Sequence, residues 1–162
     1  MIGGELEVTV ENRDPKSRIS SRRLAYWGRR ILCAAGWKKA ALSVVLVGDR
    51  EMRKFHRRYL GKTNATDVLA FPPRPLPAGR QRRVPYLGDV IISAETARRA
   101  APRFGNRWNE EVLLYLCHGL LHLMGCEDGS RREKAKMDRR QERILKKVLG
   151  NLWRSKRQKR LF

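Results

Sequence analysis

The sequence has no long hydrophobic run. None of its apolar stretches approaches the roughly 20 residues that a membrane-spanning helix requires. Its first residues, Met-Ile-Gly-Gly-Glu, include no basic region followed by an apolar segment, so we expect no secretory signal. These two absences predict a cytoplasmic protein that does not enter a membrane.

Cysteine is scarce. The three cysteines, Cys33, Cys117 and Cys126, are an odd number without the spacing of a disulfide framework, which favours a reducing compartment. Cys117 and Cys126 lie close in sequence to a pair of histidines, and either could be an alternative soft metal ligand. For Cys117 a small buried residue is the better interpretation, because free cysteine is among the most buried residue types.

Acidic residues are also few. The 162 residues include 37 Lys plus Arg against 16 Asp plus Glu, a formal net charge of +21. A surplus of this size attracts polyanions over a long range, so nucleic acid is the leading partner and an anionic membrane surface the second. A merely soluble surface would not need such a bias.

Internal repeats and interdomain linkers are absent as well. A chain of 162 residues is long enough for one domain with a proper core. We therefore expect a single domain over residues 1–150 and a short basic tail over residues 151–162, in which Trp153 and Phe162 are interspersed. The tail is either a solvated end or an arm that touches RNA.

Hydrophobic periodicity divides the chain into strands and helices. Alternating or β-branched apolar runs predict four strands, at Leu6–Glu11, Ala41–Val47, Thr66–Phe71 and Leu87–Ser93. Helical spacing predicts five helices. They run from a cap at Ser20 or Ser21 to Gly36, from Asp49 to Gly61, from Ser93 to about Phe104, from about Arg107 onwards, and from about Arg131 to Val148. The segment Val112–Met124 is apolar almost all round, which is typical of a buried central helix. We predict an α+β fold with a mixed sheet of about four strands packed with about five helices around this central helix.

Local signals add detail to these elements. Asp49 is expected to cap the helix that Gly61 closes, and His56 to lie on the exposed side of that helix. Residues 73–85 are rich in proline and arginine, which predicts a basic loop rather than a pair of strands. Asp67 and Asp89 each stand at a strand end, where a carboxylate either lines a site or bonds nearby backbone amides, and we favour the structural role.

The predicted central helix carries a histidine pair. His118 and His122 are four residues apart, so both imidazoles lie on one helical face and can reach one metal ion. Gly125 is expected to end the helix with a left-handed turn that reverses the chain. Asp128 is placed to swing back towards the ion as a third ligand.

Asp128 has an alternative role as the N-cap of the following helix, because aspartate is favoured there. Ser130 and Glu133 already form a capping-box pattern at that position, however. This second pattern leaves Asp128 available for the metal.

Gly119 stands where zinc proteases of the His-Glu-x-x-His type carry their general-base glutamate. Zinc held by three protein ligands keeps an open position, and the pKa of a water bound there falls to about 7. The pattern therefore predicts hydrolytic metal chemistry on a substrate that needs less proton shuttling than a peptide, or that draws its base from elsewhere.

Three blocks of the sequence match one known family in order. They are Thr66 to Pro72, Gly88 to Ser93 and the histidine block His118 to Gly125. Together they resemble the YbeY family of bacterial metal-dependent endoribonucleases, over a range from about Leu6 to Val148. The resemblance implies a single α+β domain that binds one zinc ion per chain through three residues and cleaves single-stranded RNA.

The resemblance also implies a biological role and a ligand set. The family is linked to ribosomal RNA maturation, particularly at the 3′ end of the small-subunit RNA, and to ribosome quality control, so ribosomal RNA and the small ribosomal subunit are expected partners. By position, His118 and His122 are metal ligands and the third ligand falls at Asp128, where the family commonly has a histidine. Aspartate is a competent zinc ligand. Glu127, where the family often has aspartate, competes for the same role.

A second departure from the family concerns catalysis. Many members have an arginine after the aromatic residue that is Tyr59 here, and this chain has Leu60 instead. Arg57, Arg58 and Lys62 are the candidates for that role, as contacts to phosphate or to the transition state. The attacking group is either a metal-bound water or the 2′ hydroxyl of RNA, and the lack of a glutamate base suits the second.

Two other functions fit part of the pattern. A non-catalytic ribosome-assembly factor would hold a structural metal and act through its basic surface, and the net charge supports this equally well. The open coordination position separates the two, because a structural zinc site is normally closed by four protein ligands. A zinc peptidase is disfavoured by Gly119 and by the charge.

Overall fold

The computed structural model describes residues 4–61, 66–150 and 153. Its elements follow one another as β1 (Glu5–Asn12), α1 (Ser21–Ala34), β2 (Lys39–Val47), α2 (Asp49–Leu60), β3 (Val68–Phe71), β4 (Tyr86–Ser93), α3 (Ala94–Arg103), α4 (Trp108–Leu123) and α5 (Arg131–Leu149). Each of the predicted strands and helices is found, with its ends shifted by a few residues at most.

The strands form one mixed sheet in the order β1-β2-β4-β3. β1, β2 and β4 run parallel to one another. β3 runs antiparallel to β4, with Val68 opposite Ile92 and Phe71 opposite Asp89, so β3 is an edge strand. The predicted α+β class with a four-stranded mixed sheet is confirmed.

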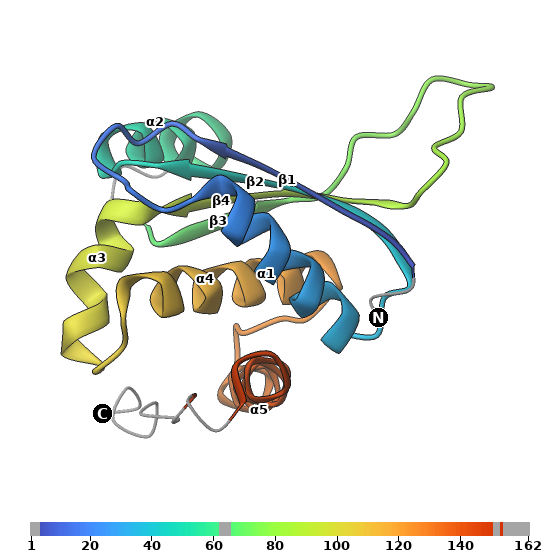
Figure 1. Ribbon diagram of the computed structural model, residues 1–162. Coiled ribbons are helices and arrows are strands. Elements are labelled where there is room, and N and C mark those ends of the chain that lie inside the picture. The colour runs from blue at the N-terminus through green and yellow to red at the C-terminus, as the bar shows by residue number, and fades with distance from the viewer. Residues whose placement is uncertain (1–3, 62–65, 151–152, 154–162) are drawn as a thin grey trace.

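Helices cover both faces of the sheet (Figure 1). α2 lies on one face, whereas α1 and α4 lie on the other, with α5 packed against both of them. The face under α2 holds a small apolar cluster of Val47, Met52, Leu69 and Ile91. The main core fills the space between the opposite face of the sheet and α1, α4 and α5.

α4 is the buried centre of this main core. Apart from His118, every residue from Glu111 to Leu121 is buried. The helix packs on β3 and β4 and is covered by α1, α3 and α5. The predicted buried central helix is confirmed, and the histidines therefore stand on an element that neighbours hold on several sides.

Side-chain caps fix the starts of two helices as predicted. The Ser20 hydroxyl accepts a hydrogen bond from the Arg23 amide at 3.3 Å and caps α1. At α5, the Ser130 hydroxyl accepts from the Glu133 amide at 3.1 Å, and the Glu133 carboxylate accepts from the Ser130 amide at 2.9 Å. The cap position of α5 is therefore filled by Ser130 and not by Asp128.

The prediction that Asp49 caps α2 is wrong. The N-cap is Gly48, and Asp49 is the first residue of the helix. Its carboxylate accepts hydrogen bonds from the hydroxyls of Ser93 and Thr96, at 2.7 and 2.6 Å. It also pairs with Arg99 at 2.6 Å. The Asp49 carboxylate does not cap α2 because it is bound instead by three donors of α3 and its N-cap, which are Ser93, Thr96 and Arg99.

The prediction that His56 lies on the exposed side of α2 is also wrong. Its exposed fraction is 5%. His56 follows Met52 by one helical turn, and Met52 is fully buried in the small cluster under α2. Residues four apart share a helical face, so His56 is turned towards the sheet with Met52.

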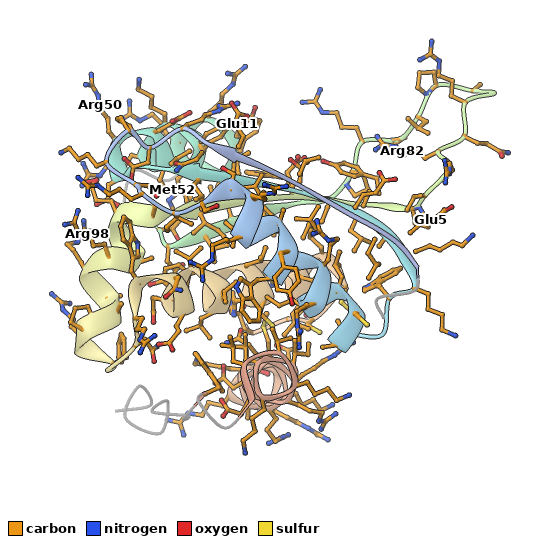
Figure 2. The ribbon with its side chains drawn as sticks, viewed as in Figure 1. Glu5, Glu11, Arg50, Met52, Arg82 and Arg98 are labelled. Carbon is orange, nitrogen blue, oxygen red and sulfur yellow. The ribbon has the colours of Figure 1, made fainter. Side chains whose placement is uncertain are left out.

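Residues 72–85 form a long connection between β3 and β4 that projects from the body of the protein (Figure 1). The segment contains neither helix nor strand, and all of it except Val84 is exposed, in agreement with the predicted basic loop. At its base, the Arg82 guanidinium lies 4.3 Å from the centre of the Tyr86 ring and Arg83 pairs with Glu5 at 2.7 Å. Figure 2 shows Arg82 and Glu5 at this place.

The three cysteines are free, and Cys117 is fully buried as predicted. Within the ranges that the structure describes, no helix has both the length and the apolar character needed to cross a membrane.

One residue of the predicted tail, Trp153, is described and packs into the main core at 4% exposure. Its indole N–H donates to the Glu142 carboxylate at 3.3 Å. The other tail residues, 151, 152 and 154–162, lie outside the described residues, so both alternatives for the tail stay predictions.

Candidate metal centre

α4 holds His118 and His122 one helical turn apart, with the two rings in edge-to-face contact. Their Nε2 atoms lie 3.0 Å apart, and the ring planes are nearly perpendicular, at 81°. The side chains are 23% and 33% exposed, so the pair lies where the core meets solvent. The four-residue spacing thus aims two ring nitrogens at one point on the surface.

The chain reverses directly after α4. Gly125 has a φ of +87°, in the left-handed region that favours glycine. Its amide donates to the His122 carbonyl at 3.0 Å, and the Cys126 amide donates to the Leu121 carbonyl at 2.9 Å. These two bonds are the pattern of a Schellman motif, which ends a helix and turns the chain back. The turn predicted at Gly125 is confirmed.

The reversed chain brings Asp128 to the two histidines. Its Oδ2 lies 3.4 Å from His118 Nε2 and 3.5 Å from His122 Nε2. In the described ranges, these three side chains form the group whose possible ligand atoms lie within 4.8 Å of one another, and Glu127 and Cys126 are not part of it. The ranges outside the described residues contain no His, Cys, Asp or Glu. The group therefore offers three protein ligands.

The spacing of these atoms fits a small tetrahedral ion. Zinc binds nitrogen and oxygen ligands at about 2.0 Å, which places two ligands of a tetrahedron about 3.3 Å apart. The three separations here are 3.0, 3.4 and 3.5 Å. The residues present can thus hold an ion of this size without moving far.

Both imidazoles are oriented through their other ring nitrogen. His122 Nδ1 lies 3.1 Å from the carbonyl oxygen of Cys126, and His118 Nδ1 lies 3.2 Å from the side-chain oxygen of Gln141. An Nδ1 that donates to such an oxygen leaves Nε2 with its lone pair, which is the tautomer that binds a metal ion through Nε2. With both rings in this tautomer, two lone pairs and a carboxylate converge on one point, and a cation placed there stabilises the arrangement.

Gln141 is the residue of this centre that sequence reasoning missed. It is fully buried on α5, where Met137, Gln141 and Leu145 form a row of residues four apart that faces the core. The signal was available in principle, because a polar residue in an otherwise apolar row needs a buried partner. That partner is a residue 23 positions earlier in the chain, which no local pattern reveals.

The environment of His118 favours its neutral form. Burial lowers the pKa of its imidazole below the ordinary value, and charge on His122 acts in the same direction. Asp67 and Asp128 act in the opposite direction, as does the hydrogen bond with Gln141, but the pKa stays lowered. Neutral imidazole is the form that binds metal ions, so the ring is prepared for this role at neutral pH.

Gly119 is required by the packing of α4 on the sheet. A Cβ at this position would lie 2.6 Å from one methyl of Val90 and 3.2 Å from a methyl of Val68. A side chain here would point into the sheet, so this fold has no room for the glutamate of His-Glu-x-x-His proteases. The lack of a glutamate therefore has a packing cause.

The aspartates near β3 and β4 make local hydrogen bonds. Asp67 accepts from the amide of Val68 at 2.8 Å, which is the structural role that we favoured. Asp89 lies inside β4 rather than at its end, and accepts from the Tyr86 hydroxyl at 2.7 Å. Burial and this contact with Asp89 raise the pKa of Tyr86 to about 12.

The predicted catalytic cations lie away from the three candidate metal ligands. Arg57 and Arg58 are exposed on the last turn of α2, and the Arg58 guanidinium lies 5.5 Å from the centre of the Tyr59 ring. α2 covers the face of the sheet opposite α4 (Figure 1). Lys62 lies outside the described residues. The structure thus joins three of the predicted site residues in one group and leaves the two arginines on an element across the sheet.

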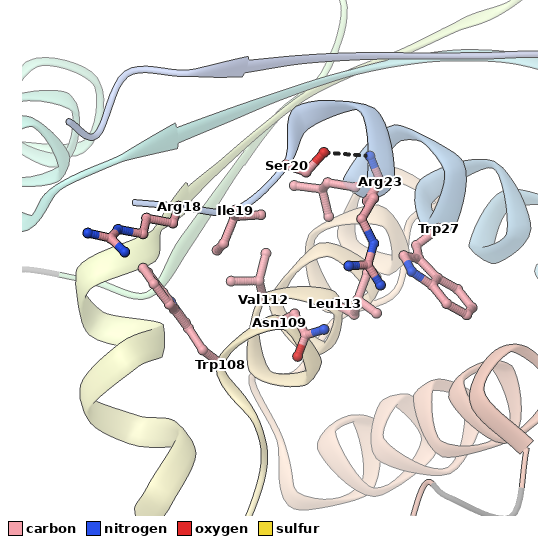
Figure 3. A pocket seen from close by; sticks show the side chains of 10 residues that line it. Arg18, Ile19, Ser20, Arg23, Trp27, Trp108, Asn109, Val112 and Leu113 are labelled. Carbon is pink, nitrogen blue, oxygen red and sulfur yellow. Dashed lines mark hydrogen bonds between the residues drawn. The ribbon is translucent and has the colours of Figure 1, made fainter. Parts of the chain in front are cut away.

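A separate hollow of about 310 Å³ lies near the start of α4 (Figure 3). It is lined by Arg18, Ile19, Ser20, Arg23, Leu24, Trp27, Trp108, Asn109, Val112 and Leu113. No ligand of the metal group lines it, and His118 lies about 15 Å further along the helix axis than Trp108. The hollow is therefore not part of the metal centre.

The chain is similar to proteins of one family. The family model described as endoribonuclease YbeY matches residues 9–149. An endoribonuclease YbeY of Myxococcus xanthus is 38% identical over 141 residues, which cover 87% of this chain and 48% of the relative. Another, from Thermus thermophilus, is 36% identical over 140 residues, which cover 86% of this chain and 98% of the relative. The chain thus spans about half the length of the first relative and nearly all of the second.

A solved structure has the same fold. The solution structure of a Thermotoga maritima protein matches with a TM-score of 0.61 at 19% identity, covering 90% of this chain and 91% of that one. The family match extends from β1 to the end of α5 and includes His118, His122 and Asp128. The resemblance carried by the three sequence blocks is therefore confirmed, and the chain belongs to the endoribonuclease YbeY family.

Proposed function

We propose that this protein is a zinc-dependent endoribonuclease that cleaves single-stranded RNA. The observation that carries the proposal is the group of His118, His122 and Asp128, which offers three ligand atoms and is partly exposed to solvent. Three protein ligands leave a coordination position for water or substrate, as in catalytic zinc sites. The relatives from Myxococcus xanthus and Thermus thermophilus are endoribonucleases by name, which supports the same activity.

In this proposal His118 and His122 hold the ion through Nε2, and Asp128 holds it through a carboxylate oxygen. A bound zinc ion supplies positive charge for the phosphate oxygens and lowers the pKa of a water ligand to about 7. The Cys126 carbonyl and Gln141 keep both Nδ1 protons on the far side of the rings, so that the Nε2 lone pairs stay directed at the ion.

Two attacking groups are compatible with these residues. A metal-bound water would leave one fragment with a terminal phosphate monoester, whereas attack by the 2′ hydroxyl would leave a 2′,3′-cyclic phosphate. The second route takes its nucleophile from the RNA itself, which suits a fold that excludes a side chain at Gly119. Analysis of the product ends distinguishes the two.

Arg57, Arg58 and Lys62 are the proposed contacts to phosphate or to the transition state. A cation near the scissile phosphate offsets the charge that develops on its oxygens. Support for the two arginines is their exposure on the last turn of α2, which leaves their guanidinium groups accessible to RNA. The net charge of +21 would draw RNA towards this surface.

We further propose ribosomal RNA as the substrate, with maturation of the 3′ end of the small-subunit RNA and ribosome quality control as the role, and the small ribosomal subunit as a partner. The support is membership of the family and the polyanion-attracting charge. A cytoplasmic location is proposed on the same basis, and the three free cysteines agree with a reducing compartment.

The test compares cleavage and bound zinc in the native protein and in three variants. His118→Ala and Asp128→Ala each remove a proposed ligand, and we expect both to lose zinc and metal-dependent cleavage of single-stranded ribosomal RNA together. Glu127→Ala is the matched control, because it removes the neighbouring exposed carboxylate that is not part of the group. It should keep both zinc and activity.

Other outcomes decide between the remaining functions. Tight RNA binding without cleavage in any sample, with zinc present in the native protein, would favour a ribosome-assembly factor with a structural metal. Metal-dependent cleavage of a peptide would revive the zinc peptidase. Loss of zinc in Glu127→Ala but not in Asp128→Ala would show that Glu127, and not Asp128, is the third ligand.

A further inference from the structure

Three aromatic rings meet on the surface beside the edge strand β3. The Tyr59 ring at the end of α2 stacks on Phe55, with 6.1 Å between centroids and 16° between planes. It also lies 5.1 Å from the ring of Phe71, the last residue of β3. Phe55 and Phe71 are half-buried, whereas Tyr59 is 46% exposed. We call Phe55, Tyr59 and Phe71 the aromatic cluster.

The inner rings of the cluster are fixed by the fold. Phe55 and Phe71 pack against the small buried apolar cluster under α2. Tyr59 is therefore supported from below and presents much of its ring to solvent, next to Leu60, which is 52% exposed. An aromatic ring held in place and left exposed loses little conformational entropy when a flat ligand stacks on it.

Positive charge lies beside the cluster and along the helix that carries Tyr59. The Arg58 guanidinium lies 5.5 Å from the centre of the Tyr59 ring. The exposed residues of α2 include five cations, Arg50, Arg53, Lys54, Arg57 and Arg58, and Arg50 projects outward in Figure 2. A ligand that combines flat aromatic groups with regularly spaced negative charges matches this surface. Unpaired RNA has both features.

The cluster and the metal centre are linked by one short strand. Phe71 ends β3, and Val68, at the start of the strand, packs beside His118 on α4, because a Cβ at Gly119 would lie 3.2 Å from a Val68 methyl. Four residues of extended chain span about 13 Å. Because β3 is an edge strand, RNA can pass from the α2 side to the α4 side around it without crossing the sheet.

We propose that Tyr59, supported by Phe55 and Phe71, is a stacking platform for an unpaired RNA base, on the other side of edge strand β3 from the metal centre. The inference rests on the proposed function for its substrate, and it adds the residue that selects single-stranded over paired RNA. A base inside a duplex keeps its faces stacked on its neighbours, so only an unpaired base can use the ring. Beside the Tyr59 ring, the Arg58 guanidinium contacts either an RNA phosphate or the face of the base.

Binding is tested with the metal removed by a chelator, so that the RNA stays intact. The dissociation constants of short single-stranded oligouridylate and of a duplex of equal charge are measured by fluorescence anisotropy for the native protein, Tyr59→Leu and Tyr59→Phe. Loss of one stacked base should weaken single-strand binding of Tyr59→Leu by about 5- to 100-fold. Duplex binding should stay unchanged, and Tyr59→Phe should bind like the native protein.

Tyr26→Leu is the matched control. Tyr26 is 42% exposed and also lies beside an arginine, with the Arg30 guanidinium 5.9 Å from the ring centre, but it stands on α1, which packs on β1 at the opposite edge of the sheet. It should bind single-stranded RNA normally. Equal losses of single-strand affinity in the Tyr26 and Tyr59 variants would overturn the proposal. Equal losses of duplex and single-strand affinity in Tyr59→Leu would also overturn it.

A second measurement uses only the native protein, in case Tyr59→Leu does not fold. Ultraviolet cross-linking to an oligonucleotide that carries 5-iodouridine should give an adduct on Tyr59 or Phe71, and adducts confined to other residues would overturn the proposal. Cleavage is measured separately. Normal single-strand binding by Tyr59→Leu in a protein that cleaves RNA would refute the platform alone, whereas lack of any cleavage by the native protein would refute only the proposed function.

Discussion

At the level of single residues, the orientation of His118 depends on a side chain from another helix. Gln141 is fully buried on α5 and contacts His118 Nδ1 at 3.2 Å. Partners of this kind fix the tautomer and the direction of a ligand ring without touching the ion. The geometry of the metal group is therefore sensitive to residues that do not belong to it.

Replacing Gln141 by leucine should weaken zinc binding by about 10- to 100-fold, the usual cost of losing a partner of a ligand histidine. Leucine keeps most of the buried volume, so the fold should persist. Zinc affinity is measured by competition with a chromogenic chelator. Gln141→Glu keeps an acceptor for Nδ1 and should retain most of the affinity. Equal affinity in the leucine variant and the native protein would show that the contact does not orient the ring.

Gly119 determines how closely α4 approaches the sheet. In Gly119→Ala the new Cβ would lie 2.6 Å from a Val90 methyl, and overpacking of this kind costs about 1–3 kcal/mol. The better helix propensity of alanine offsets about 1 kcal/mol of this cost. We expect a net loss of about 1 kcal/mol, seen as a melting temperature lower by about 2–4 °C.

The displaced helix should also weaken zinc binding, because His118 is attached next to the clash. Gly28→Ala is the matched control. Its Cβ would lie 3.0 Å from a Val8 methyl on β1, on a different helix from the ligands. This variant should keep its zinc affinity, whichever way its stability changes. Zinc affinity unchanged in Gly119→Ala would contradict a link between this packing contact and the metal centre.

At the level of elements, one carboxylate joins the starts of α2 and α3. Burial alone would raise the pKa of Asp49, but the hydroxyls of Thr96 and Ser93 and the guanidinium of Arg99 outweigh it, so the pKa is lowered. A carboxylate with a lowered folded-state pKa stabilises the fold above its unfolded pKa of about 3.9. The stabilisation is lost as the pH falls through the folded-state pKa.

Asp49→Asn should therefore lower the melting temperature at neutral pH and have little effect in acid. Loss of hydrogen bonds to a buried charged group costs about 1–3 kcal/mol, or about 2–12 °C for a chain of this size. Thermal unfolding followed from pH 7 to below about pH 3 should show the two curves converging as Asp49 becomes protonated. Glu11→Gln, at an exposed pair with Arg13, is the control and should barely change the melting temperature. A constant difference at every pH would exclude the titration of Asp49 as the cause.

At the level of the whole molecule, the excess of basic residues is displayed on projecting and exposed surfaces. The 72–85 loop is exposed along almost its whole length and carries Arg74, Arg80, Arg82 and Arg83. It extends away from the sheet on the far side from α3 (Figure 1). Such a loop can reach phosphates at a distance from the metal centre, which adds affinity without reading bases.

RNA affinity should consequently fall steeply with salt. Each phosphate contact to a single strand contributes about 0.7 to the slope of log affinity against log salt. Replacing Arg74 and Arg80 by serine should reduce this slope by about 1.4 if both contact phosphate, while the zinc content stays unchanged. The slope is measured by anisotropy at several salt concentrations. A slope that is the same in the variant and the native protein would show that the loop does not contact the RNA.

Short-range patterns were sufficient for most of the fold and for the candidate metal group. Alternation in β1, helical spacing in α1 and the capping box at Ser130 are local patterns. The structure that each one predicts depends on neighbouring residues and not on distant parts of the chain. The same holds for His118, His122 and the turn at Gly125. His56 and Asp49 were misjudged because their partners come from the sheet and from α3.

The sequence by itself determined which residues could serve as ligands, because helical periodicity and a glycine turn act over a few residues. Only the tertiary structure decided that Asp128 rather than Glu127 joins the histidines and that Gln141 orients one of them. It also decided that the aromatic cluster forms at the edge of the sheet. These contacts join segments far apart in the chain or depend on the direction in which a turn leaves a helix, and packing around the core fixes both.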